Sequence, residues 1–230
     1  MIGEEVPVSW LNETWGLALF VFWWFLWFIL WVAVVRRPVP PVIALFVYEL
    51  TLIPVVVGAL ISLEQGTASP FVLVSAWNPW VALGVGAASG FGGWLLLTAG
   101  QGVRALLPLP KNRILLARSA LDCWSALGEE LAFRYLLLSW LITMVTWWVA
   151  LLIAAALFGM HHFPVGGWKV ALVHTGSGLL FGSVQVFGGG LIAAIAAHCA
   201  YNLVVAVVRV NTFLRARQRH FRFGLAAGMR

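Results

Sequence analysis

Two adjacent carboxylates and an arginine lie within six residues of a chain that is otherwise strongly apolar. Glu129 and Glu130 begin the stretch EELAFR, and Arg134 follows Glu130 by four residues. A spacing of four places Glu130 and Arg134 on one face of a helix, where each can lower the cost of burying the other. Glu129 lies about 100° further around the helix, outside that pair. The motif predicts one supporting acid, one supporting base, and one acid free to act as a general base.

An ion network that only fixes helix packing explains the same three residues, and this helix alone does not separate the two interpretations. A charged residue in the middle of a membrane helix costs about 2.5–3.5 kcal/mol on insertion scales. Such residues therefore usually face the protein interior and mark a site or a path. The polar residues in apolar stretches are Glu49, Asp122, Glu129, Glu130, Arg134, His161, His162, His174, His198 and Asn202. The sequence assigns no role to Glu49, Asp122 or His174.

A second polar cluster lies in the stretch LFGMHHFPVGGW. His162 follows Phe158 by four residues, so the aromatic ring and the imidazole share a face of the helix, whereas His161 points elsewhere. Pro164 and the following glycine pair predict the end of the helix. Alone, a histidine near a helix end is typical of a contact with lipid headgroups.

A third cluster lies in the stretch AAIAAHCAYNL. His198 and Asn202 are four residues apart on one helix face, among alanines small enough to let another helix approach closely. A hydrogen bond between two helices is sufficient to explain such a pair on its own.

The three clusters together favour chemistry over packing. Glu129 and one histidine can activate a water molecule, while another histidine and the amide of Asn202 can donate to a developing oxyanion. These side chains are the minimum set that can hydrolyse an amide without a serine or cysteine nucleophile.

The composition indicates a polytopic membrane protein that must bring these clusters together. Of its 230 residues, 62% are hydrophobic and 10% charged, against about 45–50% and about 25% in soluble domains. The mean hydropathy is +0.96, and the 14 tryptophans are typical of membrane interfaces. We therefore expect an all-α membrane helix bundle with about seven transmembrane helices and room for a short or re-entrant eighth. The predicted spans are 16–35, 41–62, 79–100, 115–139, 141–160, 168–187 and 191–208.

Residues 1–230 are expected to form a single membrane domain. It divides into an N-terminal segment, 1–15, a bundle, 16–208, whose catalytic core covers about 115–208, and a basic tail, 209–230. The formal charge of +6 arises largely in that tail, where six of the fourteen basic residues lie. A basic tail after a membrane helix indicates contact with anionic lipid headgroups rather than with nucleic acid. With seven spans, the basic loops fall on one side, so the N-terminus is expected outside and the C-terminus in the cytoplasm.

The three motifs resemble those of the CPBP family, which groups CAAX proteases of the Rce1 type with bacteriocin-processing proteins of the ABI group. EELAFR fits EExxxR, Phe158 to His162 fits FxxxH, and His198 to Asn202 fits HxxxN, in the family's order. The resemblance covers about residues 115–208.

The resemblance implies a glutamate-dependent intramembrane endopeptidase that needs no cofactor or metal. Carried over by position, Glu129 is the base that activates water and His162 assists it. His198 and Asn202 form the oxyanion site, and Glu130 and Arg134 support the motif. His161 is a possible substitute for its neighbour.

The expected partner is a membrane-associated protein or peptide substrate. A prenylated CAAX tail, a bacteriocin leader and a C-terminal sorting tag all stay open, and the compact chain favours a prokaryotic inner membrane. Three other functions also stay open: a zinc-dependent protease using the same side chains, a non-catalytic immunity or scaffold protein, and a proton-coupled transporter.

Overall fold

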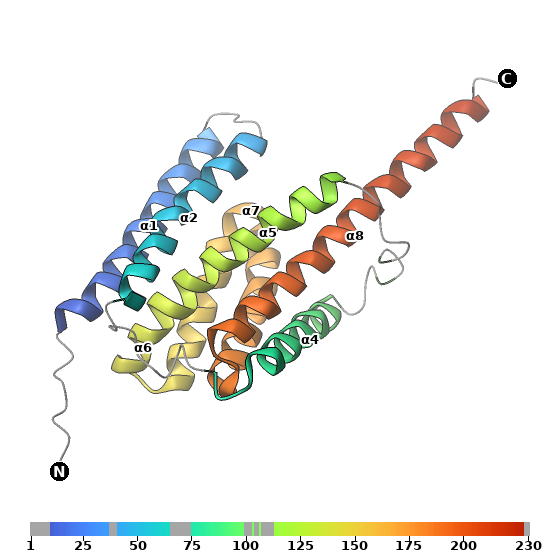
Figure 1. Ribbon diagram of the computed structural model, residues 1–230. Helices are drawn as coiled ribbons and strands as arrows, with labels where there is room; N and C mark the ends of the chain where they lie inside the picture. Colours follow the sequence, from blue (N-terminus) through green and yellow to red (C-terminus); the bar gives the residue numbers. More distant parts are fainter. Residues whose placement is uncertain are drawn as a thin grey trace, which may run out of the picture.

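Helices make up the secondary structure of the described part of the chain, as the computed structural model shows (Figure 1). The structure describes residues 10–36, 41–64, 75–98, 103, 106 and 113–227. No strand occurs among these residues, so the all-α prediction is confirmed for them. Most of the basic loop between 104 and 112 and the side chains of the tail from 216 onward lie outside the described residues. The predicted orientation in the membrane stays a prediction.

The described helices range from 5 to 38 residues in length. In chain order they are α1 (Trp10–Arg36), α2 (Pro41–Glu64), α4 (Pro79–Leu97), α5 (Arg113–Glu130), the π-helix η2 (Leu131–Leu138), α6 (Ser139–Met144), α7 (Trp147–Val184), the π-helical turn η3 (Gln185–Gly189) and α8 (Gly190–Ala227). Figure 1 shows α1 and α2 side by side at one edge of the bundle and α4 against α8 at the other.

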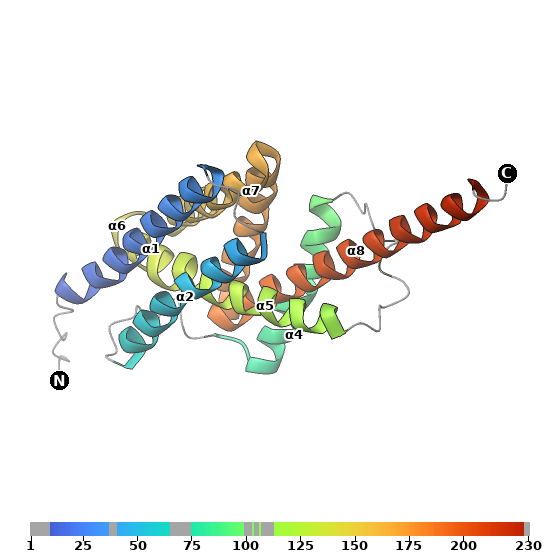
Figure 2. The same ribbon diagram turned by 90° about the horizontal axis from the view of Figure 1, so that it is seen from above.

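Helices occupy each of the seven predicted ranges, but two of the predicted boundaries are displaced. The turn expected near Ser139 lies instead at Val145, because Ser139 keeps helical backbone angles and α5, η2 and α6 run on without a break. The boundary expected at residue 208 does not interrupt α8, which continues to Ala227 and extends past the other helices in Figure 2.

The count of seven membrane spans is not confirmed. Three described stretches are long and apolar enough to cross a membrane: Pro79–Leu97, Trp147–Pro164 and Gly166–Arg215. The apolar stretches Leu17–Val32 and Phe46–Ile61 are shorter. Large apolar side chains such as Phe25 and Leu172 nevertheless lie on the outside of the bundle, as expected for a protein surrounded by lipid.

The helix α7 folds back on itself. Gly166 and Gly167 have non-helical backbone angles, with φ of +67° at Gly167, so the helix end predicted there appears as a sharp kink. Beyond the kink the two halves pack antiparallel, since a Cβ added at Gly178 would lie 3.0 Å from Phe158. A second reversal follows at Gly188 and Gly190, both with positive φ, and directs the chain into α8.

Glycines on α4 let this helix approach α8 until their backbones touch. A Cβ added at Gly90 would collide with the backbone oxygen of Ala197, and one at Gly86 would collide with that of Ala193. Small residues spaced four apart on facing helices are a common device for close packing in membranes. The approach holds α8 in place one residue before His198.

Gly90→Ala should therefore destabilise the protein, because the new methyl group forces α8 away from α4. Overpacking of this kind costs about 1–3 kcal/mol. Gly92→Ala is the matched control, since a Cβ there meets nothing within 4 Å. Thermal unfolding in detergent should show a lower midpoint for Gly90→Ala and a midpoint close to wild type for Gly92→Ala. Equal midpoints for the two variants would contradict the packing argument.

Candidate active site

Glu129 lies at the centre of the site, on the last turn of α5. Its side chain is 6% exposed, and its Oε2 atom is 3.8 Å from Nε2 of His162 and 3.8 Å from Nε2 of His198. The two histidines come from α7 and α8, so three helices distant in sequence converge on one carboxylate oxygen. The structure thus brings together the glutamate and both histidines that the motifs singled out.

The Nδ1 nitrogen of each of these two histidines has a hydrogen-bond partner that fixes the orientation of the ring. Nδ1 of His162 lies 2.9 Å from the carbonyl oxygen of Phe158, and Nδ1 of His198 lies 2.9 Å from Oε1 of Glu130. A carbonyl or carboxylate oxygen only accepts, so both Nδ1 atoms carry the proton. In the neutral rings, Nε2 is consequently an acceptor that faces Glu129.

Glu130 and Arg134 form a completely buried pair, as the spacing of four predicted. Oε2 of Glu130 lies 3.3 Å from Nε of Arg134, and the guanidinium also donates through Nη2 to the carbonyl of Gly178 at 3.1 Å. Because Glu130 binds His198 through its other oxygen, the carboxylate links the arginine on η2 to a histidine on α8.

Phe158 is a buried spacer between these charged and polar groups. Its ring centre lies 4.8 Å from the ring of His162 and 5.6 Å from that of His198. The guanidinium carbon of Arg134 lies 5.0 Å from the same centre, within the range of a cation–π contact. The phenylalanine of the FxxxH pattern therefore contacts a residue from each of the three motifs.

Tyr48 on α2 is a member of the site that the sequence analysis missed. Its hydroxyl donates to Oε1 of Glu129 at 2.5 Å and lies 3.1 Å from Nε2 of His161. The expectation that Glu129 lacks a partner is therefore wrong. The signal in the sequence was the polar pair Tyr48–Glu49 inside an apolar helix, of which only the glutamate was noted.

His161 and His174 are placed by their contacts with these residues. His161 is buried and lies 3.1 Å from the hydroxyl of Tyr48, which connects it to the carboxylate of Glu129. The ring of His174 stacks on that of His162, with centres 3.7 Å apart and planes 5° from parallel. His174, to which the sequence gave no role, thus holds the catalytic candidate His162 from the second half of α7.

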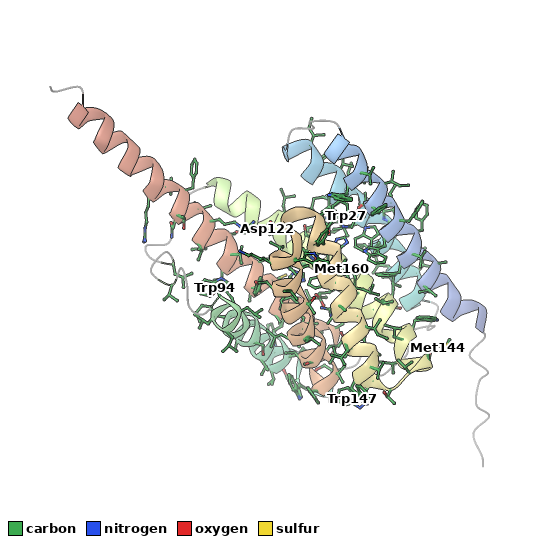
Figure 3. All side chains as sticks on the ribbon, turned by 180° about the vertical axis from the view of Figure 1, so that it is seen from behind. Trp27, Trp94, Asp122, Met144, Trp147 and Met160 are labelled. Carbon is green, nitrogen blue, oxygen red and sulfur yellow. The ribbon has the colours of Figure 1, made fainter. Side chains whose placement is uncertain are left out.

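Asn202 bonds to the backbone of α5. Its amide donates to the carbonyl of Asp122 at 3.1 Å, where α5 runs beside α8 (Figure 3). Asp122 precedes Glu129 by seven residues, about 10 Å along the helix. The structure therefore brings His198 to Glu129 and ties Asn202 to the backbone of α5.

Glu49, the other acid without a predicted role, lies outside this cluster. Its carboxylate accepts a hydrogen bond from the hydroxyl of Ser125, which joins α2 to α5. Across the described part of the chain, no group of three or more His, Cys, Asp or Glu side chains has an arrangement that could hold a metal ion.

The segment that carries the three motifs matches a known protein family. Residues 114–204 match the family described as type II CAAX prenyl endopeptidase Rce1-like. This segment contains all three motifs and leaves out α1, α2 and α4. The resemblance expected from the motifs is confirmed over this segment, and with the apolar helices it indicates an integral membrane protein. Searches among curated proteins and among solved structures gave no match.

Proposed function

Because residues 114–204 match the Rce1-like CAAX prenyl endopeptidases, we propose that this protein is an intramembrane endopeptidase acting on a membrane-associated protein or peptide. The observation that carries the proposal is the convergence of Glu129, His162 and His198 on one point inside the bundle, with Oε2 at 3.8 Å from both Nε2 atoms. Glu129 and His198 are buried and the side chain of His162 is 15% exposed, which suits a reaction that must exclude most of the bulk solvent.

The nucleophile is a water molecule held between Glu129 and His162. A separation of 3.8 Å is too long for a direct hydrogen bond, yet one water can lie about 2.8 Å from each atom. Both atoms accept, so the water donates one hydrogen to Oε2 and the other to Nε2. Glu129 takes a proton as the water oxygen attacks the peptide carbonyl, and that proton passes to the leaving amine when the C–N bond breaks.

The oxyanion is stabilised from α8. His198 donates to the oxyanion from Nε2 when its ring carries both protons, while Nδ1 stays bonded to Glu130. Asn202 joins it either through its second amide hydrogen or by leaving the Asp122 carbonyl when substrate binds. Donors in these positions are worth about 100- to 1,000-fold in turnover each.

The substrate class follows from the surroundings of the site. A scissile bond must reach a carboxylate inside a membrane bundle, so the substrate is held at the membrane by a lipid anchor or by an apolar segment. A prenylated tail, a bacteriocin leader and a C-terminal sorting tag meet this requirement equally, and the genes next to this one would name the substrate. We also propose that the protein lies in a prokaryotic inner membrane with its N-terminus outside. Its basic tail would then contact anionic headgroups on the cytoplasmic side of that membrane.

Cleavage of membrane-tethered reporters in liposomes tests the proposal. A panel with prenylated, leader-type and tag-type ends should yield a discrete product by mass spectrometry with at least one reporter. The same reporter should stay intact with Glu129→Ala. Equal turnover by wild type and Glu129→Ala would overturn the assignment.

Chelators test whether the same side chains work through a metal instead. Turnover of the cleaved reporter should stay within about twofold of its starting value after incubation with 1,10-phenanthroline, because water activation here needs only a carboxylate and an imidazole. A magnesium-loaded chelator is the control for non-specific effects on the liposomes. Activity that is lost with the chelator and returns with zinc would make the protein a zinc protease.

A further inference from the structure

We propose that Tyr48, supported by His161, is a positioning residue that fixes the orientation of the Glu129 carboxylate. The helix pair α1–α2, outside the segment that matches the family, would then be a working part of the active site. This inference rests on the proposed endopeptidase function.

The hydrogen-bond directions define a short chain of three residues. A tyrosine hydroxyl has one hydrogen, which goes to Oε1 of Glu129 because the carboxylate is the stronger acceptor. The hydroxyl oxygen must then accept from Nε2 of His161, 3.1 Å away. The chain runs from His161 through Tyr48 to Glu129 and ends at the oxygen opposite the one that faces the two histidines.

Among the described residues, Tyr48 is the hydrogen-bond partner of His161. Aromatic rings enclose it: Trp23 at 5.0 Å, Trp27 at 5.2 Å and Phe133 at 5.6 Å between ring centres. Its Nδ1 atom is buried without a hydrogen-bond partner among the described residues. Trp27 of α1, labelled in Figure 3, thus lies against His161 of α7. Burying an imidazole with one of its nitrogens unsatisfied is costly, and the hydrogen bond to Tyr48 is the best explanation for it among the described residues.

The need for a positioning residue follows from the glutamate side chain. The terminal torsion of glutamate is broad and nearly twofold, so an unrestrained carboxylate rotates freely about its last bond. With Oε1 held by Tyr48, Oε2 stays between His162 and His198, where the water must bind. Misplacement of a reacting group by about 1 Å can cost about 100-fold in rate.

Tyr48→Phe removes the hydroxyl and keeps the ring, so it tests positioning with little change in packing. We expect kcat for the reporter to fall about 10- to 100-fold while KM stays within about twofold, since the hydroxyl acts on the base and not on the substrate. Tyr201→Phe is the matched control. It removes the hydroxyl of a buried tyrosine on α8 for which no hydrogen bond to Glu129 occurs among the described residues, and it should keep wild-type kcat.

Variants of His161 separate positioning from packing. His161→Gln keeps an N–H donor near the position of Nε2 and should retain most of the activity, whereas His161→Phe keeps the ring and should lose nearly as much as Tyr48→Phe. The double variant Tyr48→Phe with His161→Phe should be no slower than Tyr48→Phe alone, because both changes interrupt one chain. Additive losses, or equal activity for the Gln and Phe variants, would contradict the chain.

The outcomes distinguish this inference from the function on which it rests. If Glu129→Ala abolishes cleavage but Tyr48→Phe keeps wild-type kcat, the positioning role is wrong and the endopeptidase stands. If Glu129→Ala cleaves as fast as wild type, the endopeptidase itself is wrong. A thermal midpoint is measured for each variant, and should Tyr48→Phe fail to fold, the comparison of His161→Gln with His161→Phe decides.

Discussion

Glu129→Gln should reduce turnover of the reporter by about 100- to 10,000-fold, the range that a general base contributes. Glutamine has the shape of glutamate and can still contact Tyr48, but its amide cannot take a proton from water at neutral pH. The loss should therefore appear in kcat, with KM within about twofold of wild type. Initial rates in liposomes over a range of reporter concentrations give both constants.

Glu49→Gln is the matched control for this substitution. Glu49 is also a buried acid on an apolar helix, but its carboxylate is bonded to Ser125, which lies one turn before Glu129 on α5. This variant should keep wild-type kcat. A Glu129→Gln protein that cleaves normally, or that fully rescues a deletion strain, would instead support a non-catalytic immunity or scaffold role.

The sequence was a good guide to which residues meet because helical spacing is a local property. The pairs Glu130–Arg134 and Phe158–His162 share a helix face at four residues apart, and both are in contact in the structure. The glycine pair after Pro164 likewise predicted a break in α7 that the backbone angles show. Each of these inferences needed only the geometry of one turn of helix.

Contacts between helices were beyond the same reasoning. Nothing local to Tyr48 indicates that α2 packs against α5, so the partner of Glu129 could not be found from spacing. The stacking of His174 on His162 depends on the sharp reversal at Gly167, whose angle the sequence does not determine. Asn202 is a further example. Its spacing from His198 places both on one helix face, but the spacing does not predict its hydrogen bond to the Asp122 carbonyl, which depends on how α8 lies along α5.

Glu130→Ala should destabilise the folded protein by about 3–5 kcal/mol, the cost of removing one partner from a buried ion pair. Arg134 and Glu130 are both completely buried, and the carboxylate also accepts from His198. Without it, the guanidinium still contacts the Gly178 carbonyl and the face of Phe158 but loses the carboxylate beside it. Equilibrium unfolding in mixed micelles, followed by circular dichroism, measures the change.

The adjacent glutamate supplies the control that separates the two roles. Glu129→Ala removes a carboxylate from the next position on the same helix, but it leaves no opposite charge buried alone, so its stability should stay within about 1 kcal/mol of wild type. The double variant Glu130→Leu with Arg134→Met should recover most of the stability lost in Glu130→Ala, because an apolar pair of similar volume replaces the ions. Replacing Glu129 would then mainly lower turnover, whereas replacing its neighbour Glu130 would lower stability. Equal stability of Glu130→Ala and Glu129→Ala would contradict this prediction. It would mean that water reaches Arg134 and that other contacts, not the buried pair, hold η2 against α7 and α8.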